Sequence, residues 1–261
     1  MKTTIFCFSG TGNSYYVANR LAKELGDTTV VMIASAMHSE VLEMTERVGF
    51  VFPTYKGFPP LIVKQFIENV FAKQDLLPIK YSFLITTRYK FAGYSLVATE
   101  LMLQKAGCLS SYSTHVVMPD GYVPLMDVQD EQKIEDLYAK ANEKISKIAA
   151  DLDDEKLKLS AKPPFTKLAL YRFMPVSHLA SKDFSEKFQV TEDCTDCALC
   201  YRMCPTGNIV MEEGQPSFGD NCLGCLGCYH RCPTKAIQFK KKVHAGRYPN
   251  QRSGYSVEYR N

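Results

Sequence analysis

The sequence predicts an α/β fold, in which a doubly wound parallel sheet of five strands is followed by a small α+β domain. Two observations predict this class. Residues 1 to about 151 alternate five short apolar or β-branched runs with amphipathic stretches of helical period. Eight of the ten cysteines then gather between Cys194 and Cys232, in a segment too dense in cysteine to belong to the same unit.

The five predicted strands are runs that suit a sheet buried on both faces. They are Thr3–Phe8, Thr29–Ile33, Val48–Phe52, Tyr81–Thr86 and Thr114–Met118. The predicted helices between and after them are Ser14–Leu25, Pro60–Phe71, Ser95–Ala106 and Gln129–Ala150. Strands joined by crossover helices indicate a parallel sheet with helices on both faces.

Changes of composition divide the rest of the chain. A charged stretch after Asp151 and the pair Pro163-Pro164 predict a boundary, followed by a linker and a bridging helical segment over 152–188. The cysteine-rich unit is expected over 189–239. Residues 240–261 form a basic tail with six basic residues and a single acid, Glu258. The tail therefore has a formal charge of about +5, and the rest of the chain about −2, which together give the net charge of +3. A solvated tail is favoured over a strip that docks an acidic partner or an anionic cofactor.

The cysteines form an internal repeat with an offset of 28 residues. Each half has the spacing CxxCxxCxxxCP, and Tyr201, Thr206 and Ile209 recur at the same offset as Tyr229, Thr234 and Ile237. Even, tight intervals let one chain wrap three corners of a 4Fe-4S cube, and in such runs the fourth cysteine ligates the other cluster. We therefore expect one cube on Cys194, Cys197, Cys200 and Cys232, and the other on Cys222, Cys225, Cys228 and Cys204.

Zinc is the alternative metal, but a tetrahedral zinc site needs two pairs of ligands and has no use for a third cysteine at the same interval. The segment resembles bacterial two-cluster ferredoxins over about 50 residues. It departs from them at the position after the second cysteine of each half, where glycine is common and this chain has Ala198 and Leu226. Cys7 and Cys108 stand apart in apolar surroundings and are expected to be buried.

A glycine-rich loop directly follows the first predicted strand and runs into a helix, the arrangement of an anion site. Its residues are Ser9, Gly10, Thr11, Gly12, Asn13 and Ser14. The loop lacks the lysine of a nucleotide-hydrolysing P-loop, and Tyr15 stands where a dinucleotide fingerprint needs glycine. A purely structural glycine turn is the remaining alternative. The loop resembles the FMN phosphate loop of flavodoxins, and that resemblance implies that its hydroxyls, amides and backbone N–H groups hold a phosphate.

The same resemblance implies that the flavin ring lies between the loops after the third and fourth strands. The expected residues are Pro53, Thr54, Tyr55, Lys56, Gly57, Thr87, Arg88, Tyr89, Lys90, Phe91, Ala92, Gly93 and Tyr94. Tyr55 and Tyr89 are candidates for stacking on the ring. The segment Asp120-Gly121-Tyr122 is expected to close the pocket. The five histidines form no cluster, so a catalytic role is not expected for any of them.

Together these features resemble the flavodoxin-ferredoxin fusion proteins of anaerobes, over nearly all of the chain. Membership of that family implies an electron carrier with FMN and two 4Fe-4S clusters that serves a redox partner protein. A reductase of a small organic substrate, with Tyr89 or Lys90 as proton donor, is the alternative. A regulatory protein that binds nucleic acid through the basic tail has no support from the glycine loop. Homodimers are common among such flavodoxin-like domains, so a homodimer is also possible.

The expected compartment is the cytoplasm. The early apolar run Thr4–Phe8 is too short for a secretory signal, and no stretch approaches the roughly 20 apolar residues that span a bilayer.

Overall fold

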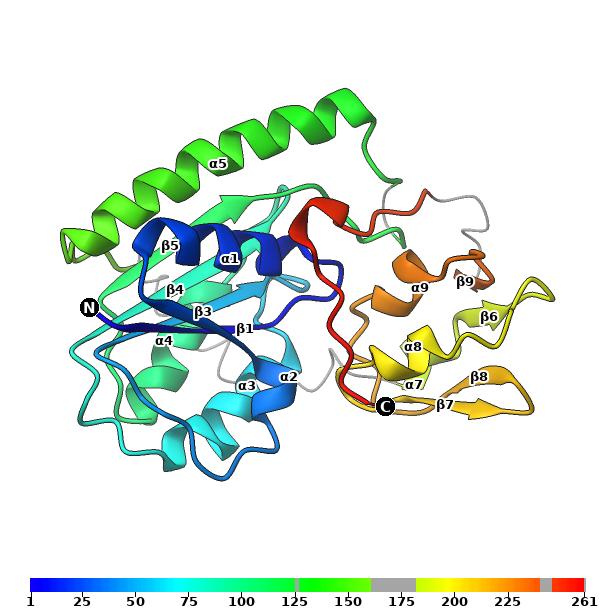
Figure 1. Cartoon of the computed structure of the whole chain (residues 1–261), viewed down its shortest axis with the longest axis horizontal. Helices are drawn as coiled ribbons and strands as arrows, with labels where there is room; N and C mark the ends of the chain where they lie inside the picture. The colour runs from blue at the N-terminus through cyan, green and yellow to red at the C-terminus, as the bar shows by residue number, and fades with distance from the viewer. Residues whose placement is uncertain (125–126, 161–181, 240–245, 261) are drawn as a thin grey trace.

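The computed structural model describes residues 1–124, 127–160, 182–239 and 246–260, as a sheet-containing unit beside a smaller cysteine-rich unit (Figure 1). Most of the predicted bridging segment lies outside the described residues. Among those residues, no helix has the length and apolar character needed to cross a membrane.

The larger unit is built on one sheet with strands in the order β2-β1-β3-β4-β5. All neighbouring strands are parallel, so the predicted fold class is confirmed. This order, with its reversal beside β1, is that of the flavodoxin-like doubly wound sheets. The strands are β1 Thr3–Cys7, β2 Thr28–Met32, β3 Arg47–Pro53, β4 Tyr81–Arg88 and β5 Tyr112–Val117.

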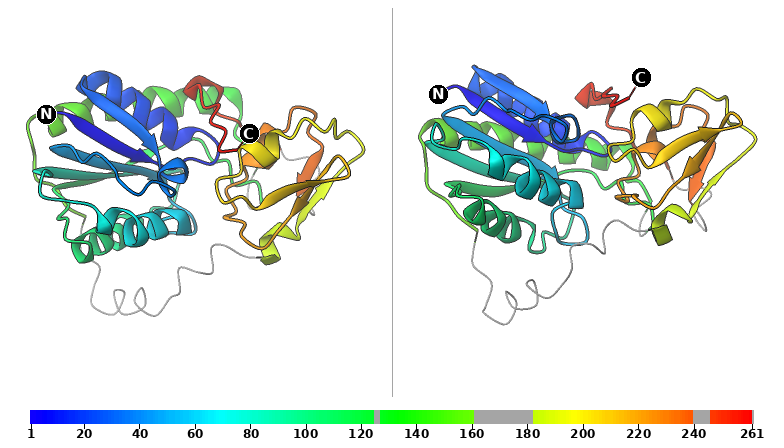
Figure 2. Two further views of the ribbon diagram at one scale, coloured as in Figure 1. Left: turned by 60° about the horizontal axis from the view of Figure 1, so that its bottom comes forward. Right: turned by 90° about the horizontal axis from the view of Figure 1, so that it is seen from below.

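Helices cover both faces of the sheet (Figures 1 and 2). On one face, α1 (Asn13–Leu25) and α5 (Glu131–Asp153) bury apolar side chains such as Val17 and Ile145. On the other, α3 (Leu61–Asn69) and α4 (Ser95–Lys105) pack on the phenylalanines of β1 and β3. Two short elements were not predicted: α2 (Ile33–Ala36) and a 3₁₀ turn, Phe71–Lys73. Cys7 and Cys108 are buried, as expected.

The larger unit continues beyond the predicted boundary at residue 151. Helix α5 runs on to Asp153. Lys158 then forms a parallel bridge with Tyr112 at the edge of the sheet, and the Ser160 N–H donates to Glu100 at 3.0 Å. The charged residues that signalled a linker therefore lie on the last turn of a helix and on a short edge segment.

The smaller unit consists of two antiparallel pairs of strands and three short helices. In one pair, β6 (Phe188–Val190) joins the two ends of the unit by pairing with β9 (Ile237–Phe239). The hairpin of β7 (Ile209–Glu212) and β8 (Gln215–Phe218) is the second pair. The helices are α7 Lys182–Ser185, α8 Leu199–Arg202 and α9 Gly227–Arg231. The last two occupy the same position in each half of the repeat.

Residues 246–260, which we call the strap, return to the junction of the two units (Figure 1). The sequence favoured a solvated tail, and for these residues that prediction is wrong. Tyr248, Asn250 and Tyr255 are 7%, 2% and 6% exposed. The basic charges that suggested solvation make contacts within the chain, since Arg252 pairs with Glu135 and Arg260 stacks on the ring of Tyr201.

His115 on β5 makes the stability of the larger unit depend on pH. Burial, together with the charges of Arg88, Lys144 and Lys158, lowers its pKa to about 4. The unfolded chain keeps an ordinary histidine pKa of about 6.5 and takes up this proton first, so the free energy of unfolding falls as the pH drops from about 6.5 towards 4. We expect His115→Gln to lose less stability than the wild type between pH 7.5 and 5.5, measured by urea denaturation. Equal losses would contradict this account.

Candidate functional site

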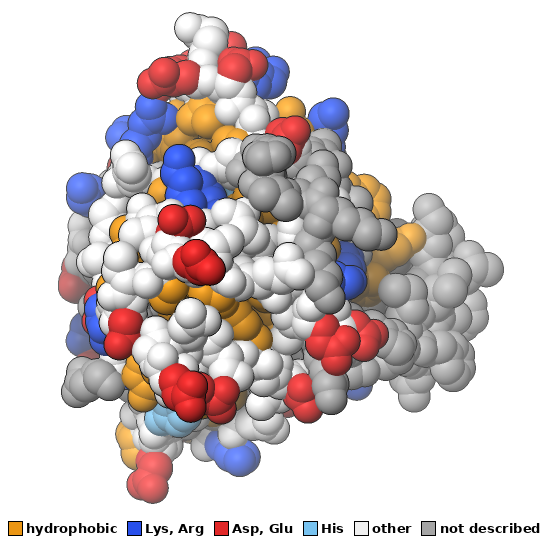
Figure 3. Space-filling view, turned by 90° about the vertical axis from the view of Figure 1, so that its right-hand side faces the viewer, with side chains coloured by type: hydrophobic (Ala, Val, Ile, Leu, Met, Phe, Trp, Pro, Cys, Tyr) orange, Lys and Arg blue, Asp and Glu red, His pale blue; other side chains and the backbone are white. Residues whose placement is uncertain are grey.

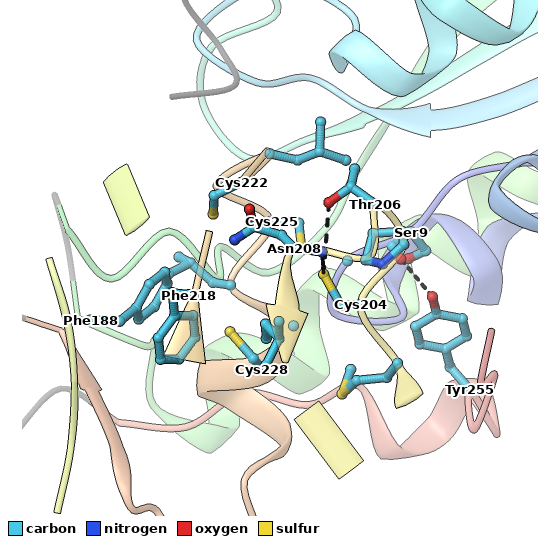
Figure 4. Close-up of a pocket in the computed structure, with 17 residues that line it drawn as sticks. Ser9, Phe188, Cys204, Thr206, Asn208, Phe218, Cys222, Cys225, Cys228 and Tyr255 are labelled. Carbon is cyan, nitrogen blue, oxygen red and sulfur yellow. Dashed lines mark hydrogen bonds between the residues drawn. The ribbon is translucent and has the colours of Figure 1, made fainter. Parts of the chain in front are cut away.

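Four cysteines surround a small cavity in the smaller unit, which we call the cysteine cavity (Figure 4). Three of them, Cys222, Cys225 and Cys228, come from the second half of the repeat, and Cys204 comes from the first. Apolar side chains line the rest of the cavity, including Met203, Ile209, Phe218, Leu223 and Leu226. This is the set that the sequence predicts for one crossed cluster, and we call it the proximal set.

The other four cysteines form a second set, which we call the distal set. Burial raises the pKa of Cys200 to about 11, and the neighbouring thiols of Cys197, Cys232 and Cys194 raise it further. Burial likewise raises the pKa of Cys228 well above its usual value, with contributions from Cys225, Cys222 and Cys204 and a last one from Cys200 of the distal set. Each set thus combines three cysteines of one half with the fourth cysteine of the other.

The residues in each set fit an iron-sulfur cube better than a single ion. Each set offers four thiols, the number that a 4Fe-4S cube takes, and the four cysteines of the proximal set stand around a cavity. Zinc would need its sulfurs within about 2.3 Å of one centre. A cube binds each sulfur at a separate iron corner, so its ligands stand farther apart around a common cavity.

Hydrogen-bond donors approach the sulfurs of the proximal set. The Asn208 N–H lies 3.3 Å from Cys204 Sγ, and the Gly224 N–H lies 3.4 Å from Cys222 Sγ. The duplication is visible in the hydroxyls, because Thr206 and Thr234 lie 3.7 Å from Cys204 Sγ and Cys232 Sγ respectively. Such donors stabilise negative charge on the sulfurs and tune the potential of a bound cluster.

The two positions where glycine is common in ferredoxins have left-handed backbones. The φ angles are 54° at Ala198 and 58° at Leu226, each at the N-terminus of the short helix that carries the third cysteine. A Cβ in this conformation costs about 1–2 kcal/mol. Leu226 offsets that cost by burying its side chain to 2% exposure, where it lines both cavities of the site.

The glycine loop has the geometry of an anion site. Gly12 precedes α1 with a φ of 103°, no side chain among the described residues caps the helix, and its first turn carries no acid. Ser9 Oγ accepts the Gly12 N–H at 3.1 Å. Uncapped N–H groups at a helix start are the donors that a phosphate monoester accepts.

The Asn13 side chain braces this loop. Its Nδ2 donates to Pro119 O at 2.8 Å, and its Oδ1 accepts from Tyr248 OH and Asn250 Nδ2 at 3.1 and 3.0 Å. The sequence-based hypothesis assigned this side chain to the phosphate. The structure gives it three partners within the chain instead, leaving the backbone of the loop as the better candidate to bind the anion.

A cavity of about 320 Å³, which we call the loop cavity, opens over the glycine loop at the carboxyl edge of the sheet. Its volume suits one drug-sized ligand. The hydroxyl of Thr54 is buried with no partner among the described residues, so it has hydrogen-bonding capacity to offer. Predicted residues that line the cavity are Ser9, Gly10, Thr11, Asn13, Ser14, Pro53, Thr54, Tyr55, Lys56, Gly57, Thr87, Arg88, Tyr89, Lys90, Phe91 and the segment Asp120–Tyr122.

Four predicted residues do not line the loop cavity: Gly12, Ala92, Gly93 and Tyr94. Gly93 instead lets the loops after β3 and β4 pack closely together, because a Cβ placed on it would lie 2.2 Å from the Gly57 Cα. The Tyr94 N–H donates to Gly57 O at 2.7 Å, and its ring packs on Phe58. These residues set the spacing of the loops from outside the cavity.

Sequence reasoning missed the contribution of the smaller unit to the loop cavity. Phe184 and the segment Leu223–Leu226 line it. Tyr55, a stacking candidate, lies where the two units meet. Burial raises the pKa of its hydroxyl, and the nearby Cys225 and Cys222 raise it further. Tyr89 lines the cavity, and the Lys90 ammonium lies over its ring at 5.5 Å from the ring centre. No signal in the sequence relates residues 9–14 to residues 223–226.

The two cavities share a wall formed by Ser9, Gly10, Leu223, Cys225 and Leu226. A Cβ placed on Gly10 would lie 2.6 Å from the Cys225 carbonyl oxygen, and one placed on Gly227 would lie 3.0 Å from the Gly10 carbonyl. The glycine loop and the second cysteine loop therefore touch backbone to backbone. Glycine is required at both positions because a side chain would separate the loops.

Comparisons with known proteins matched one family model and several solved structures. Residues 193–237 match a family model described as a 4Fe-4S dicluster domain. No curated protein matches the chain. Among solved structures, the chain is similar to the two-electron reduced flavodoxin of Megasphaera elsdenii, with 17% identity over 57% of this chain and 98% of that one and a TM-score of 0.37.

Two further solved structures cover similar shares of the chain. One is the rubredoxin oxygen:oxidoreductase of the anaerobe Desulfovibrio gigas, at 14% identity over 59% of this chain and 37% of that one, with a TM-score of 0.39. The other is an FMN-dependent NADH-azoreductase of Bacillus anthracis, at 13% identity over 58% and 99%, also with a TM-score of 0.39. The described structure therefore places a parallel sheet with the strand order of flavodoxin-like folds beside a segment that matches a 4Fe-4S domain.

Crossed ligation can be tested with the fourth cysteines. We expect Cys204→Ala to damage the cluster of the proximal set, although Cys204 is closer in sequence to Cys200, because its sulfur faces the cysteine cavity. Cys232→Ala should damage the distal cluster. Iron content and EPR spectra of the reduced variants distinguish the two. Loss of the cluster nearest in sequence would show that ligation is not crossed.

The left-handed positions give a matched pair of substitutions. Ala198→Gly should stabilise the folded chain by about 1 kcal/mol, because it removes the Cβ from a left-handed backbone. Leu226→Gly removes the same strain but also a buried side chain, at a cost of about 2 kcal/mol or more. Thermal denaturation under anaerobic conditions, followed by cluster absorption, should give a higher midpoint for the first and a lower one for the second. A lower midpoint for both would refute the strain argument.

Proposed function

We propose that this chain relays electrons between two 4Fe-4S clusters and FMN, so that one-electron and two-electron redox steps are joined for a partner protein. FMN exchanges one or two electrons and each cluster exchanges one. The contribution of the chain is to hold these groups in a fixed order at short range. The observation that carries the proposal is the wall shared by the cysteine cavity and the loop cavity.

The wall supports an order for the relay. Cys225 belongs to the proximal set and also lines the loop cavity, so the proximal cluster would be the neighbour of the flavin. The distal set lies toward the outside, where Cys197 is exposed. Electrons would enter or leave at the distal set and reach the flavin through the proximal set.

The surroundings of the distal set support a partner with a basic surface. The exposed acids Glu192, Asp193 and Asp196 precede Cys197 in the sequence. Asp196 approaches the turn of the β7–β8 hairpin, with its Oδ2 3.4 Å from a Cβ placed on Gly214. Figure 3 shows acidic side chains spread over this end of the molecule. Charge of one sign speeds the encounter with a partner of the opposite sign.

Within the loop cavity, the chain offers separate groups for the two ends of FMN. The glycine loop and the N-terminus of α1 would bind the phosphate, while the loops around Tyr55 and Tyr89 would hold the ring. Leu223 and Leu226 would exclude water on the side of the clusters, since each is at most 5% exposed. The loop cavity thus offers donors for an anion at one end and apolar and aromatic side chains for a ring at the other.

A reductase of a small substrate has less support. Tyr89 and Lys90 do line the loop cavity, as that alternative requires, but Lys90 is also exposed to solvent. The cavity is large enough for about one drug-sized molecule. Because the cysteine loop and Phe184 form part of its lining, little room remains for a substrate above a bound flavin.

Anaerobic reconstitution followed by a redox titration tests the relay. We expect about eight irons and one FMN per chain, with flavin absorption and cluster EPR signals that titrate in the same sample. In Cys204→Ala, flash photoreduction by an external one-electron donor should no longer pass electrons rapidly to the flavin. A protein without flavin bands, with markedly fewer irons, or with flavin reduction unaffected by Cys204→Ala would refute the relay.

A further inference from the structure

The strap contacts the glycine loop through its backbone. The Asn250 N–H donates to Thr11 O at 2.8 Å, and the Tyr255 hydroxyl donates to Ser9 O at 2.7 Å. Tyr248 and Asn250 also donate to Asn13 Oδ1. Alternate residues of the loop, at positions 9, 11 and 13, are thus held from sites about 240 positions later in the chain.

The strap supports the loop from behind. No residue among 246–260 lines the loop cavity, whereas most of the glycine loop does. A Cβ placed on Gly12 would lie 2.6 Å from Ser253 Oγ and 3.0 Å from Asn250 Cβ. The strap therefore packs directly on the side of the loop that faces away from the cavity, and it leaves the anion-binding side open.

The strap has a rigid geometry of its own. Ser253 donates its N–H to Asn250 Oδ1 at 3.1 Å and its hydroxyl to Asn250 O, while Tyr255 donates its N–H to Ser253 Oγ at 3.0 Å. The Tyr138 hydroxyl on α5 lies 2.6 Å from that of Tyr248 and anchors this end. Groups fixed in this way lose little entropy when they hold the loop.

Two arginines of the strap contact the two halves of the cysteine repeat at equivalent positions. Arg247 stacks on Tyr229 at 3.5 Å and donates to the Ile237 carbonyl at 2.8 Å. Arg260 stacks on Tyr201 at 4.2 Å and donates to the Ile209 carbonyl at 3.3 Å. Tyr201 and Tyr229, like Ile209 and Ile237, are related by the offset of 28 residues.

We propose that the strap residues Tyr248, Asn250 and Tyr255 are positioning residues that hold the glycine loop in its phosphate-binding shape. The inference rests on the proposed FMN site. None of the three residues lines the loop cavity, although Tyr255 also lines the cysteine cavity. Since the same segment grips both halves of the repeat, it couples phosphate binding to the fold of the cluster unit. Such coupling is reciprocal, so FMN would stabilise the cluster unit by as much as the intact cluster unit favours FMN.

Tyr255→Phe is the sharpest test, because it removes only the hydroxyl that donates to Ser9 O. Tyr259→Phe is the matched control: the Tyr259 hydroxyl lies 2.8 Å from that of Tyr255, and the Tyr259 backbone contact to Arg202 is unaffected. The chain, with its clusters intact and its flavin removed, is titrated with FMN and with riboflavin, which lacks the phosphate. Quenching of flavin fluorescence gives each Kd.

We expect Tyr255→Phe to raise the Kd of FMN about threefold to tenfold, the effect of one lost hydrogen bond. The Kd of riboflavin and the iron content should stay near those of the wild type, and Tyr259→Phe should change neither Kd. An unchanged Kd for FMN in Tyr255→Phe, or equal weakening of FMN and riboflavin, would overturn the inference. A wild-type chain that binds no FMN would refute the proposed function instead.

A second pair covers the case in which Tyr255→Phe does not fold. Tyr248→Phe removes the donor to Asn13 Oδ1, while Tyr138→Phe removes the hydroxyl on the other side of Tyr248 and leaves that donor in place. Tyr248→Phe should weaken FMN binding more than riboflavin binding, and Tyr138→Phe should weaken FMN binding less than Tyr248→Phe does. The reverse order would argue against a positioning role for the strap.

Discussion

The contact of two backbones, at Gly10 and at Cys225, is the constraint on which the rest of the site depends. It joins the anion loop of a parallel sheet to the ligand loop of a cysteine repeat, with no side chain between them. The close approach of the two loops determines which side chains line both cavities. Leu223 and Leu226 can line both cavities only because the loops touch, and Tyr55 can lie beside Cys225 only because Gly10 leaves room for its hydroxyl.

A contact of this kind needs support, because two small backbone surfaces bury little area. The strap supplies it by holding the glycine loop with hydrogen bonds and the repeat with two stacked arginines. Arginine suits this work, since its planar group can stack on an aromatic ring while donating to carbonyl oxygens in its own plane. The buried His230 adds a further tie: it accepts the Tyr248 N–H at 2.9 Å and its other nitrogen lies 2.6 Å from Gly121 O.

The sequence predicts the parts of this molecule that depend on local pattern. Buried strands such as Val48–Phe52 stand out as apolar runs, and the offset of 28 residues pairs each cysteine with its equivalent. Contacts across the junction were not predictable, because no local pattern relates Asn13 to Asn250 or Gly10 to Cys225. The sequence of the strap did contain an indication of burial, but its basic charge favoured the prediction of a solvated tail. Tyr248, Tyr255 and Tyr259 lie within one short basic segment, and three large aromatic rings are rarely left in solvent.

The duplicated halves offer the same pattern of cysteines, yet their surroundings differ. The proximal set lines an enclosed cavity with apolar walls, where burial raises the pKa of Cys225 to about 12, while the distal set includes the exposed Cys197. An apolar wall disfavours added negative charge, whereas N–H groups aimed at sulfur favour it. In the proposed relay, any difference between the two halves would therefore come from what each half packs against, since their cysteine patterns are the same, and the glycine loop and the strap contribute to that packing.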